Sequence, residues 1–164
     1  MNTSQHLCTS FYAPEPHDYY RDWVNAFEWN IGLTIQPCNP RYTAGDMESL
    51  GSEVISELSA MLRVSSGLWM CFVREQSRAE GLWHLHGLMR LDSNKRIKWM
   101  RRQGEDRIRR CCDQFADRRG SRHSDPSIDI FNEDSTGGDR WISYINKESF
   151  KDPNGDRWIF GRPH

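Results

Sequence analysis

The side chains best suited to chemistry in this chain lie in two short groups. His84 and His86 flank a leucine in the apolar stretch of residues 81–91, a pattern typical of a strand. Side chains two residues apart on a strand point to the same face, so both imidazoles can bind one metal ion. Tyr144 and Lys147 lie in a stretch predicted to be helical, where residues three apart are neighbours. A metal ion beside a phenol and an amine is suited to cutting a phosphodiester.

A carboxylate would complete the metal site, and the sequence offers two. Glu75 follows the preceding predicted strand (residues 68–74), and a turn in the loop of residues 76–81 would bring it beside His84. Glu80 lies within that loop and is the alternative. Two imidazoles and one carboxylate with open positions suit Mg²⁺ or Mn²⁺ acting on a phosphate oxygen. The alternative is that the two histidines bind no metal ion and lie in the core or face the solvent, which is the more common case for such a pair.

The helical stretch separates a core face from a reactive face. Trp141 and Ile145 fit its buried stripe, whereas Tyr144 and Lys147 fall to one side, beside Arg140. A phenol among cations loses its proton more easily and can attack phosphorus, which would form a phosphotyrosine ester. Lys147 would then hold the phosphate or neutralise charge in the transition state. The alternative is a core tyrosine with its hydroxyl at the rim.

Positioning these groups requires a sheet and a helix, and the sequence predicts both. Strands are predicted at residues 29–36, 68–74, 81–91 and 127–131. A first helix is predicted over residues 46–62, with Asp46 as its N-cap. A second helix is predicted from a cap at residues 92–94 to about residue 115, and a third after Gly137. The order βαββαβ and then a helix is that of the ferredoxin-like (split βαβ) fold, an α+β fold whose antiparallel sheet has helices on one face.

The rest of the chain fits one domain. Residues 158–160 are expected to add a short strand, and residues 1–27 form an extended or partly helical lead-in to a domain over residues 28–164. The 164 residues suffice for a substantial core, and 37% hydrophobic and 27% charged residues are ordinary for a soluble protein. Because we find neither a membrane-length apolar run nor a signal segment, we expect a cytoplasmic protein with no membrane partner.

The cysteines indicate reduced thiols. There are five, an odd number, and none forms a CxxC pair. This count argues against both a disulfide framework and a zinc ribbon. We therefore expect free cysteines, several of them buried.

The net charge of −1 hides a concentrated basic segment. Residues 95–122 contain eleven Lys and Arg but only four acids, which makes their local charge +7. Such a segment suits a polyphosphate backbone. The predicted DNA-binding residues are Arg101, Arg102, Arg109 and Arg110. The alternative is a solvated helix face with ion pairs.

Three of these segments, in this order, resemble the HUH endonucleases, specifically the Rep-type rolling-circle replication initiators with a single catalytic tyrosine. Residues 32–36 (GLTIQ) resemble the first motif, a strand of the sheet. His84-Leu85-His86 resembles the second motif, the metal-binding histidine pair, and residues 144–147 (YINK) resemble the third, the YxxK helix. The resemblance covers about residues 30–150, and it implies an HUH endonuclease domain.

The resemblance implies metal-dependent nicking and joining of single-stranded DNA. His84, His86 and a carboxylate placed like Glu75 would hold Mg²⁺ or Mn²⁺ at the scissile phosphate. Tyr144 would become joined to the 5′ phosphate and release a 3′ hydroxyl that primes rolling-circle replication of a plasmid, phage or virus. Lys147 matches the lysine that helps orient the site. The implied partners are single-stranded or hairpin DNA at a replication origin and, since no P-loop sequence is present, a host helicase and polymerase.

Some features depart from the family or favour one branch of it. The predicted helix has no second tyrosine, and Gln36 stands where many Rep proteins have an aromatic or another residue. Single-tyrosine HUH transposases share the histidines but usually place a glutamine after the tyrosine, so Lys147 favours a Rep protein over the transposase alternative.

Two other classes compete with this interpretation. A cupin-type oxygenase would need an acid soon after His86, and residues 87–91 contain none. An RRM-like nucleic-acid-binding module shares the fold and stacks bases on strand aromatics. Candidates for that stacking are Trp69, Phe72, Trp83 and Phe131. That interpretation leaves the histidine pair and the YxxK helix without a purpose.

Overall fold

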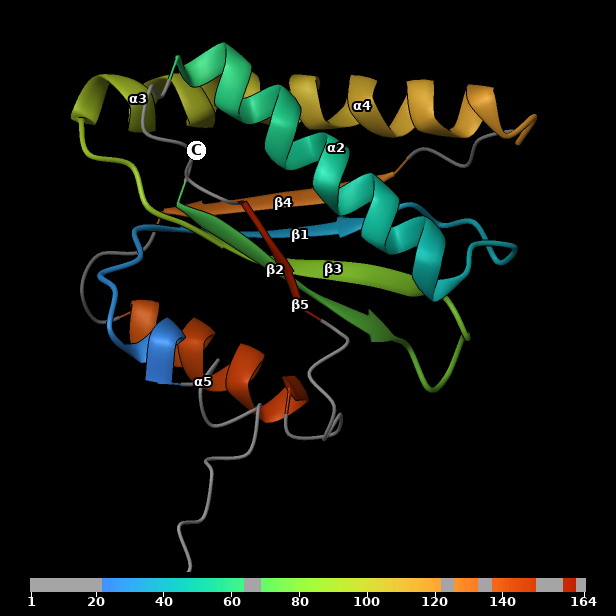
Figure 1. Ribbon diagram of the computed structural model, residues 1–164, viewed down its shortest axis with the longest axis horizontal. Coiled ribbons are helices and arrows are strands. Elements are labelled where there is room, and N and C mark those ends of the chain that lie inside the picture. The colour runs from blue at the N-terminus through green and yellow to red at the C-terminus, as the bar shows by residue number, and fades with distance from the viewer. Residues whose placement is uncertain (1–21, 64–68, 122–125, 133–136, 150–157, 162–164) are drawn as a thin grey trace, which may run out of the picture.

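The chain folds into one antiparallel sheet with helices on both faces (Figure 1). The computed structural model describes residues 22–63, 69–121, 126–132, 137–149 and 158–161. The elements are β1 (Ile31–Gln36), α2 (Ala44–Leu62), β2 (Met70–Gln76), β3 (Trp83–Met89), α3 (Asn94–Trp99), the π-helical turn η1 (Met100–Gly104), α4 (Glu105–Arg118), β4 (Ser127–Asn132), α5 (Gly137–Ser149) and β5 (Trp158–Phe160). Residues 22–25 add a helical turn before β1. The predicted order βαββαβ and then a helix is confirmed.

The order of strands across the sheet is β4-β1-β3-β2-β5, and every neighbouring pair is antiparallel. β3 lies between β1 and β2, the two strands that α2 connects. This is the split βαβ arrangement, so the sheet is consistent with a ferredoxin-like fold. β5, the short strand expected at residues 158–160, pairs with the outer edge of β2.

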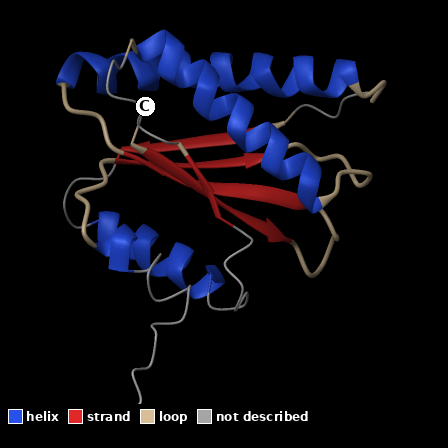
Figure 2. Cartoon of the chain, in the orientation of Figure 1, coloured by secondary structure: helices blue, strands red, loops and turns tan. Residues whose placement is uncertain are grey.

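The prediction that all helices lie on one face of the sheet is only partly correct. α2 and α4 cover one face of the sheet, and α5 with the turn at residues 22–25 covers the other (Figure 2). The prediction holds for α2 and α4 and is wrong for α5. The physical reason lies in the strands, because both of their faces are apolar. Leu33 and Leu85 point into the first layer while Val73 and Leu88 point into the second, and both faces need cover.

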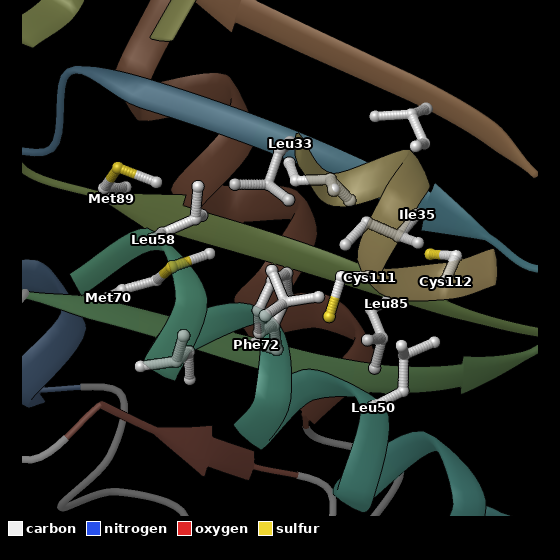
Figure 3. Packing of buried hydrophobic residues seen from close by; sticks show 14 of the residues in the cluster. Leu33, Ile35, Leu50, Leu58, Met70, Phe72, Leu85, Met89, Cys111 and Cys112 are labelled. Carbon is white, nitrogen blue, oxygen red and sulfur yellow. The ribbon is translucent and has the colours of Figure 1, made fainter. Parts of the chain in front are cut away.

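The larger core lies between the sheet and α2 with α4. Figure 3 shows Leu50 and Leu58 of α2 packed near Leu33, Leu85 and Phe72 of the sheet. The helical spacing read from the sequence is confirmed in α2. Its buried apolar residues are Met47, Leu50, Val54, Ile55, Leu58 and Leu62.

A second cluster lies between the sheet and α5. Val24 and Ile145 are fully buried there against Leu88 and Val73. Because Val24 is part of this core, the end of the predicted lead-in belongs to the folded domain. Residues 1–21 lie outside the described residues.

The N-cap of α2 is Thr43, not Asp46 as predicted. The Thr43 hydroxyl accepts from the Asp46 amide, and the Asp46 carboxylate accepts from the Thr43 amide at 2.8 Å, which forms a capping box. Burial of Asp46 opposes its ionisation, but hydrogen bonds from Thr43 and Arg119 outweigh that effect and lower the pKa of Asp46. The cap predicted at residues 92–94 is confirmed, with Ser93 as the N-cap of α3.

The described cysteines are free, as expected, and Cys71, Cys111 and Cys112 are buried. Burial raises the pKa of Cys111 to about 11 and that of Cys112 to about 12, so both thiols stay protonated at neutral pH. Cys8 lies outside the described residues. In the part of the chain that the structure covers, no helix has the length and apolar character needed to cross a bilayer.

Candidate metal centre

The β2–β3 hairpin brings a carboxylate beside the histidine pair. The strands pair so that Glu75 lies opposite His84. The hairpin loop is closed by hydrogen bonds of 2.8 Å from the Ser77 amide to the Leu82 carbonyl and from the Gly81 amide to the Ser77 carbonyl. Gly81 adopts a φ of +68°, a left-handed conformation that glycine reaches without a steric penalty. The loop thus sets the register that aligns the two elements of the site.

Glu75, His84 and His86 form a group that can hold a metal ion. Glu75 Oε2 lies 3.2 Å from His84 Nε2 and 3.1 Å from His86 Nε2. One ligand atom from each residue lies within 4.8 Å of the others, and no other such group occurs among the described residues. The side chain of Glu75 is 16% exposed, that of His84 14% and that of His86 9%. Glu80, the alternative carboxylate, is exposed in the loop and outside the group.

One contact at the imidazoles fits a bound cation. The Thr34 hydroxyl on β1 lies 3.1 Å from His86 Nδ1. A metal ion at Nε2 requires the ring proton on Nδ1, and Thr34 is placed to accept it and so to orient the ring. His84 Nδ1 is buried and has no hydrogen-bond partner among the described residues, so no such contact orients the His84 ring.

Tyr144 on α5 reaches this group from the second helical layer. Its hydroxyl donates to Glu75 Oε2 at 3.2 Å, and its ring centroid lies 5.0 Å from that of His86. The side chain is 38% exposed. The phenol therefore lies next to the candidate metal ligands and is open to solvent, not hidden in the core. Ile145 is fully buried, as the helical spacing predicted.

Trp141 holds α5 against the sheet, a role that sequence reasoning did not assign. The indole Nε1 donates to the Gly87 carbonyl at 3.0 Å. A Cβ atom on Gly32 would lie 2.6 Å from that nitrogen, so the strand glycine leaves the space that the ring occupies. The signal that could have identified this contact is Gly32, because a glycine inside a strand often marks a close approach.

Thr34 was also missed as a site residue, although it lies within the segment 32–36 that resembled the first motif. Its signal was a polar side chain in an apolar strand. β1 and β3 pair with Thr34 opposite His86, and that register decides the contact.

Lys147 stands on the exposed side of α5, three residues after Tyr144. Arg140 is exposed four residues before Tyr144, so the three side chains follow one face of the helix. Within the part of the chain that the structure describes, Lys147 forms no hydrogen bond or ion pair with Glu75, His84 or His86.

The structure does not bring the basic segment to this site. α4 packs on the opposite face of the sheet from α5. Arg101, Arg102 and Arg110 are exposed in that layer, whereas Arg109 donates to the Pro126 carbonyl at 3.0 Å and pairs with Glu105. Other basic residues of α4 and its C-cap pair with acids of α2, namely Arg107 with Glu57, Arg118 with Glu53 and the C-cap Arg119 with Asp46. Part of the segment is thus the ion-paired helix face considered as the alternative.

Comparison with known proteins identifies no relative of this chain. No family model, no curated protein and no solved structure matches this chain. The features of the molecule that indicate a function are the group of Glu75, His84 and His86 and the tyrosine that contacts it.

Proposed function

We propose that this chain nicks and rejoins single-stranded DNA through a 5′-phosphotyrosine intermediate on Tyr144, with Mg²⁺ or Mn²⁺ bound by Glu75, His84 and His86. One observation carries the proposal. The Tyr144 hydroxyl hydrogen-bonds to Glu75 Oε2, the oxygen that lies 3.2 and 3.1 Å from the two imidazole nitrogens. A nucleophile and a divalent-ion site are thus within reach of one phosphate.

The residues present have the chemistry that such an ion prefers. Two imidazole nitrogens and one carboxylate oxygen can hold a divalent ion and leave positions for water and phosphate, and the two nitrogens favour Mn²⁺ over Mg²⁺, which prefers oxygen ligands. When bound, the ion would polarise a non-bridging phosphate oxygen and offset developing negative charge.

The proposed reaction exchanges one ester bond for another. Tyr144 Oη forms a bond to phosphorus while the bond between phosphorus and the 3′ oxygen breaks. The phenolic proton passes to the Glu75 carboxylate, which already accepts its hydrogen bond, or to water. The leaving 3′ oxygen takes a proton from water. In the joining step a 3′ hydroxyl attacks the phosphotyrosine and releases Tyr144.

Lys147 supplies charge for this reaction. Its exposed position one turn after Tyr144 suits a phosphate approaching along α5. A cation aimed at the phosphoryl oxygens stabilises the charge that builds in the transition state.

The resemblance to Rep-type HUH endonucleases supports a role in starting rolling-circle replication, at an origin of single-stranded or hairpin DNA and with host helicase and polymerase as partners. A single-tyrosine HUH transposase would use the same chemistry, and Lys147 favours the Rep role. The RRM-like alternative needs an open sheet with stacking aromatics. Of the four candidate aromatics, Phe72 is fully buried, Trp69 and Trp83 are partly buried and only Phe131 is exposed. Because α5 also covers the second face, the sheet does not present the row of stacking aromatics that an RRM-like module uses.

The experiment is incubation of the protein with a random pool of single-stranded oligonucleotides and Mn²⁺, followed by a denaturing gel and mass spectrometry of the linked peptide. We expect a covalent adduct on Tyr144 and free 3′ hydroxyl ends. Tyr144→Phe should form no adduct and should bind the pool as the wild type does, because only the nucleophilic oxygen is lost. An adduct on Tyr144→Phe, or none on the wild type, would contradict the proposal.

A further inference from the structure

Two large hydrophobic side chains are exposed among the described residues, and both touch the same tryptophan. They are Phe131 on β4, 41% exposed, and Tyr144 on α5, 38% exposed. The Phe131 ring centroid lies 5.3 Å from that of Trp141 at an interplanar angle of 57°. The Tyr144 ring centroid lies 5.7 Å from that of Trp141, and the two rings are nearly parallel at 13°. We call these three side chains the aromatic platform.

The aromatic platform is continuous with the candidate metal centre. The Trp141 ring centroid lies 5.6 Å from that of His86, and Tyr144 contacts both His86 and Glu75. Phe131 is therefore two ring contacts away from the candidate nucleophile. A base that rests on Phe131 would therefore lie on the same connected aromatic surface as Tyr144.

The aromatic platform is held in place without help from a ligand. The only polar atom of the Trp141 side chain is used in the hydrogen bond to Gly87, and the ring fills the space above Gly32. Phe131 extends from a strand that pairs with β1 throughout its length. A preordered ring loses little conformational entropy on binding a flat partner.

The charge beside the aromatic platform favours a nucleotide as that partner. Arg140 and Lys147 are exposed on the same helix as Trp141 and Tyr144. Aromatic rings next to cations make up the sites that bind unpaired nucleotides, in which a base stacks on a ring while a cation meets the phosphate. Bases within a duplex are already stacked on their neighbours, so only a single strand can use such a surface.

We propose that Phe131 stacks the base of a nucleotide adjoining the scissile phosphate, so that the aromatic platform positions the single strand over Tyr144. This inference rests on the proposed function and names the substrate feature that this site would recognise. Phe131 is a positioning residue here, because it touches the neighbouring base and not the reacting atoms.

The test is a two-by-two comparison of dissociation constants, measured in EDTA so that no cleavage occurs. The wild type and Phe131→Ala are each titrated with a dT 12-mer and with a 12-mer of abasic nucleotides, which keeps the phosphates and lacks every base. Losing a stacked base costs about 5- to 150-fold in affinity. We expect Phe131→Ala to weaken binding of the dT 12-mer by that factor and to leave binding of the abasic 12-mer unchanged.

Two further variants make the result specific. Phe131→Trp should keep the preference for dT over abasic DNA, because an indole also stacks. Trp99→Ala removes a partly buried aromatic from the α2 and α4 layer and should leave both affinities unchanged. Equal effects of Phe131→Ala on both 12-mers would contradict the proposal that Phe131 stacks a base. An effect of Trp99→Ala equal to that of Phe131→Ala would also contradict it.

The outcomes separate this inference from the proposed function. A covalent adduct on Tyr144 without any Phe131-dependent preference for dT would contradict base stacking on Phe131 and support the nicking reaction. A Phe131-dependent preference with no adduct under any condition would support base stacking and contradict the nicking reaction. No binding of the wild type to either 12-mer would overturn both.

Discussion

At the scale of single residues, Glu75 Oε2 is the atom where the candidate metal ligands and the candidate nucleophile meet. Both imidazoles and the Tyr144 hydroxyl lie within 3.2 Å of it. The oxygen can serve a metal ion and still lie next to the phenol that would attack phosphorus. The carboxylate therefore links the two halves of the proposed chemistry, and its replacement should affect both.

We expect Glu75→Gln to weaken Mn²⁺ binding and to abolish adduct formation, because a neutral amide is a much poorer ligand for a hard cation. Isothermal titration with Mn²⁺ and the adduct gel measure the two effects. Glu80→Gln is the matched control, since this carboxylate lies exposed in the adjoining loop. If Glu80→Gln lost Mn²⁺ binding and Glu75→Gln retained it, the ligand assignment would be wrong.

At the scale of elements, the position of α5 decides whether Tyr144 reaches the metal centre. Its anchors are Ile145 in the second core and Trp141 over Gly32 of β1. A helix that must fit into a slot left by one glycine is sensitive to a single added methyl group. Thr34 lies two residues further along β1, so this strand supports both the helix and a histidine.

We expect Gly32→Ala to lower the free energy of unfolding by about 1–3 kcal/mol and to reduce adduct formation, because the new Cβ atom would overlap the Trp141 ring. Chemical denaturation and the adduct gel are the measurements. Gly45→Ala, in the first turn of α2 with no contact closer than 3.8 Å, should be neutral or stabilising by up to about 1 kcal/mol. Full stability and activity of Gly32→Ala would show that Trp141 does not depend on this slot.

At the scale of the whole molecule, the sheet separates two surfaces. One carries the candidate metal centre and the exposed residues of α5, and the other carries η1 and α4 with Arg101, Arg102 and Arg110. That these arginines contact DNA stays a prediction. A DNA strand that is cut at Tyr144 would have to continue around the edge of the β-sheet to contact these arginines. Alternatively, a second segment of the same DNA would contact them.

We expect the double variant Arg101→Glu and Arg102→Glu to bind a single-stranded 12-mer as the wild type does, because the sheet lies between these residues and Tyr144. With a longer DNA that contains a hairpin, the same variant should lower the salt dependence of binding by about one unit of slope for each lost phosphate contact. Titrations over a range of salt concentrations measure both slopes. Arg140→Glu, on the side of Tyr144, should weaken binding of the 12-mer, and the opposite pattern for the two variants would reverse the assignment of surfaces.

Much of this molecule follows from local periodicity. Residues two apart on a strand share a face, so His84 and His86 had to point the same way wherever β3 lay. Helical spacing alone separated buried Ile145 from exposed Tyr144, and it also identified the core stripe of α2. These features depend on backbone geometry within one element, and the sequence by itself determined them.

Tertiary structure decided what stands opposite each element. The choice of Glu75 over Glu80 came from the register of a hairpin, and the contact of Thr34 with His86 came from pairing between strands more than fifty residues apart. The passage of α5 to the second face, away from the basic helix, followed from the apolar side chains on both sides of the sheet. Such contacts depend on burying surface from distant segments together, and no pattern within one segment can specify its partner.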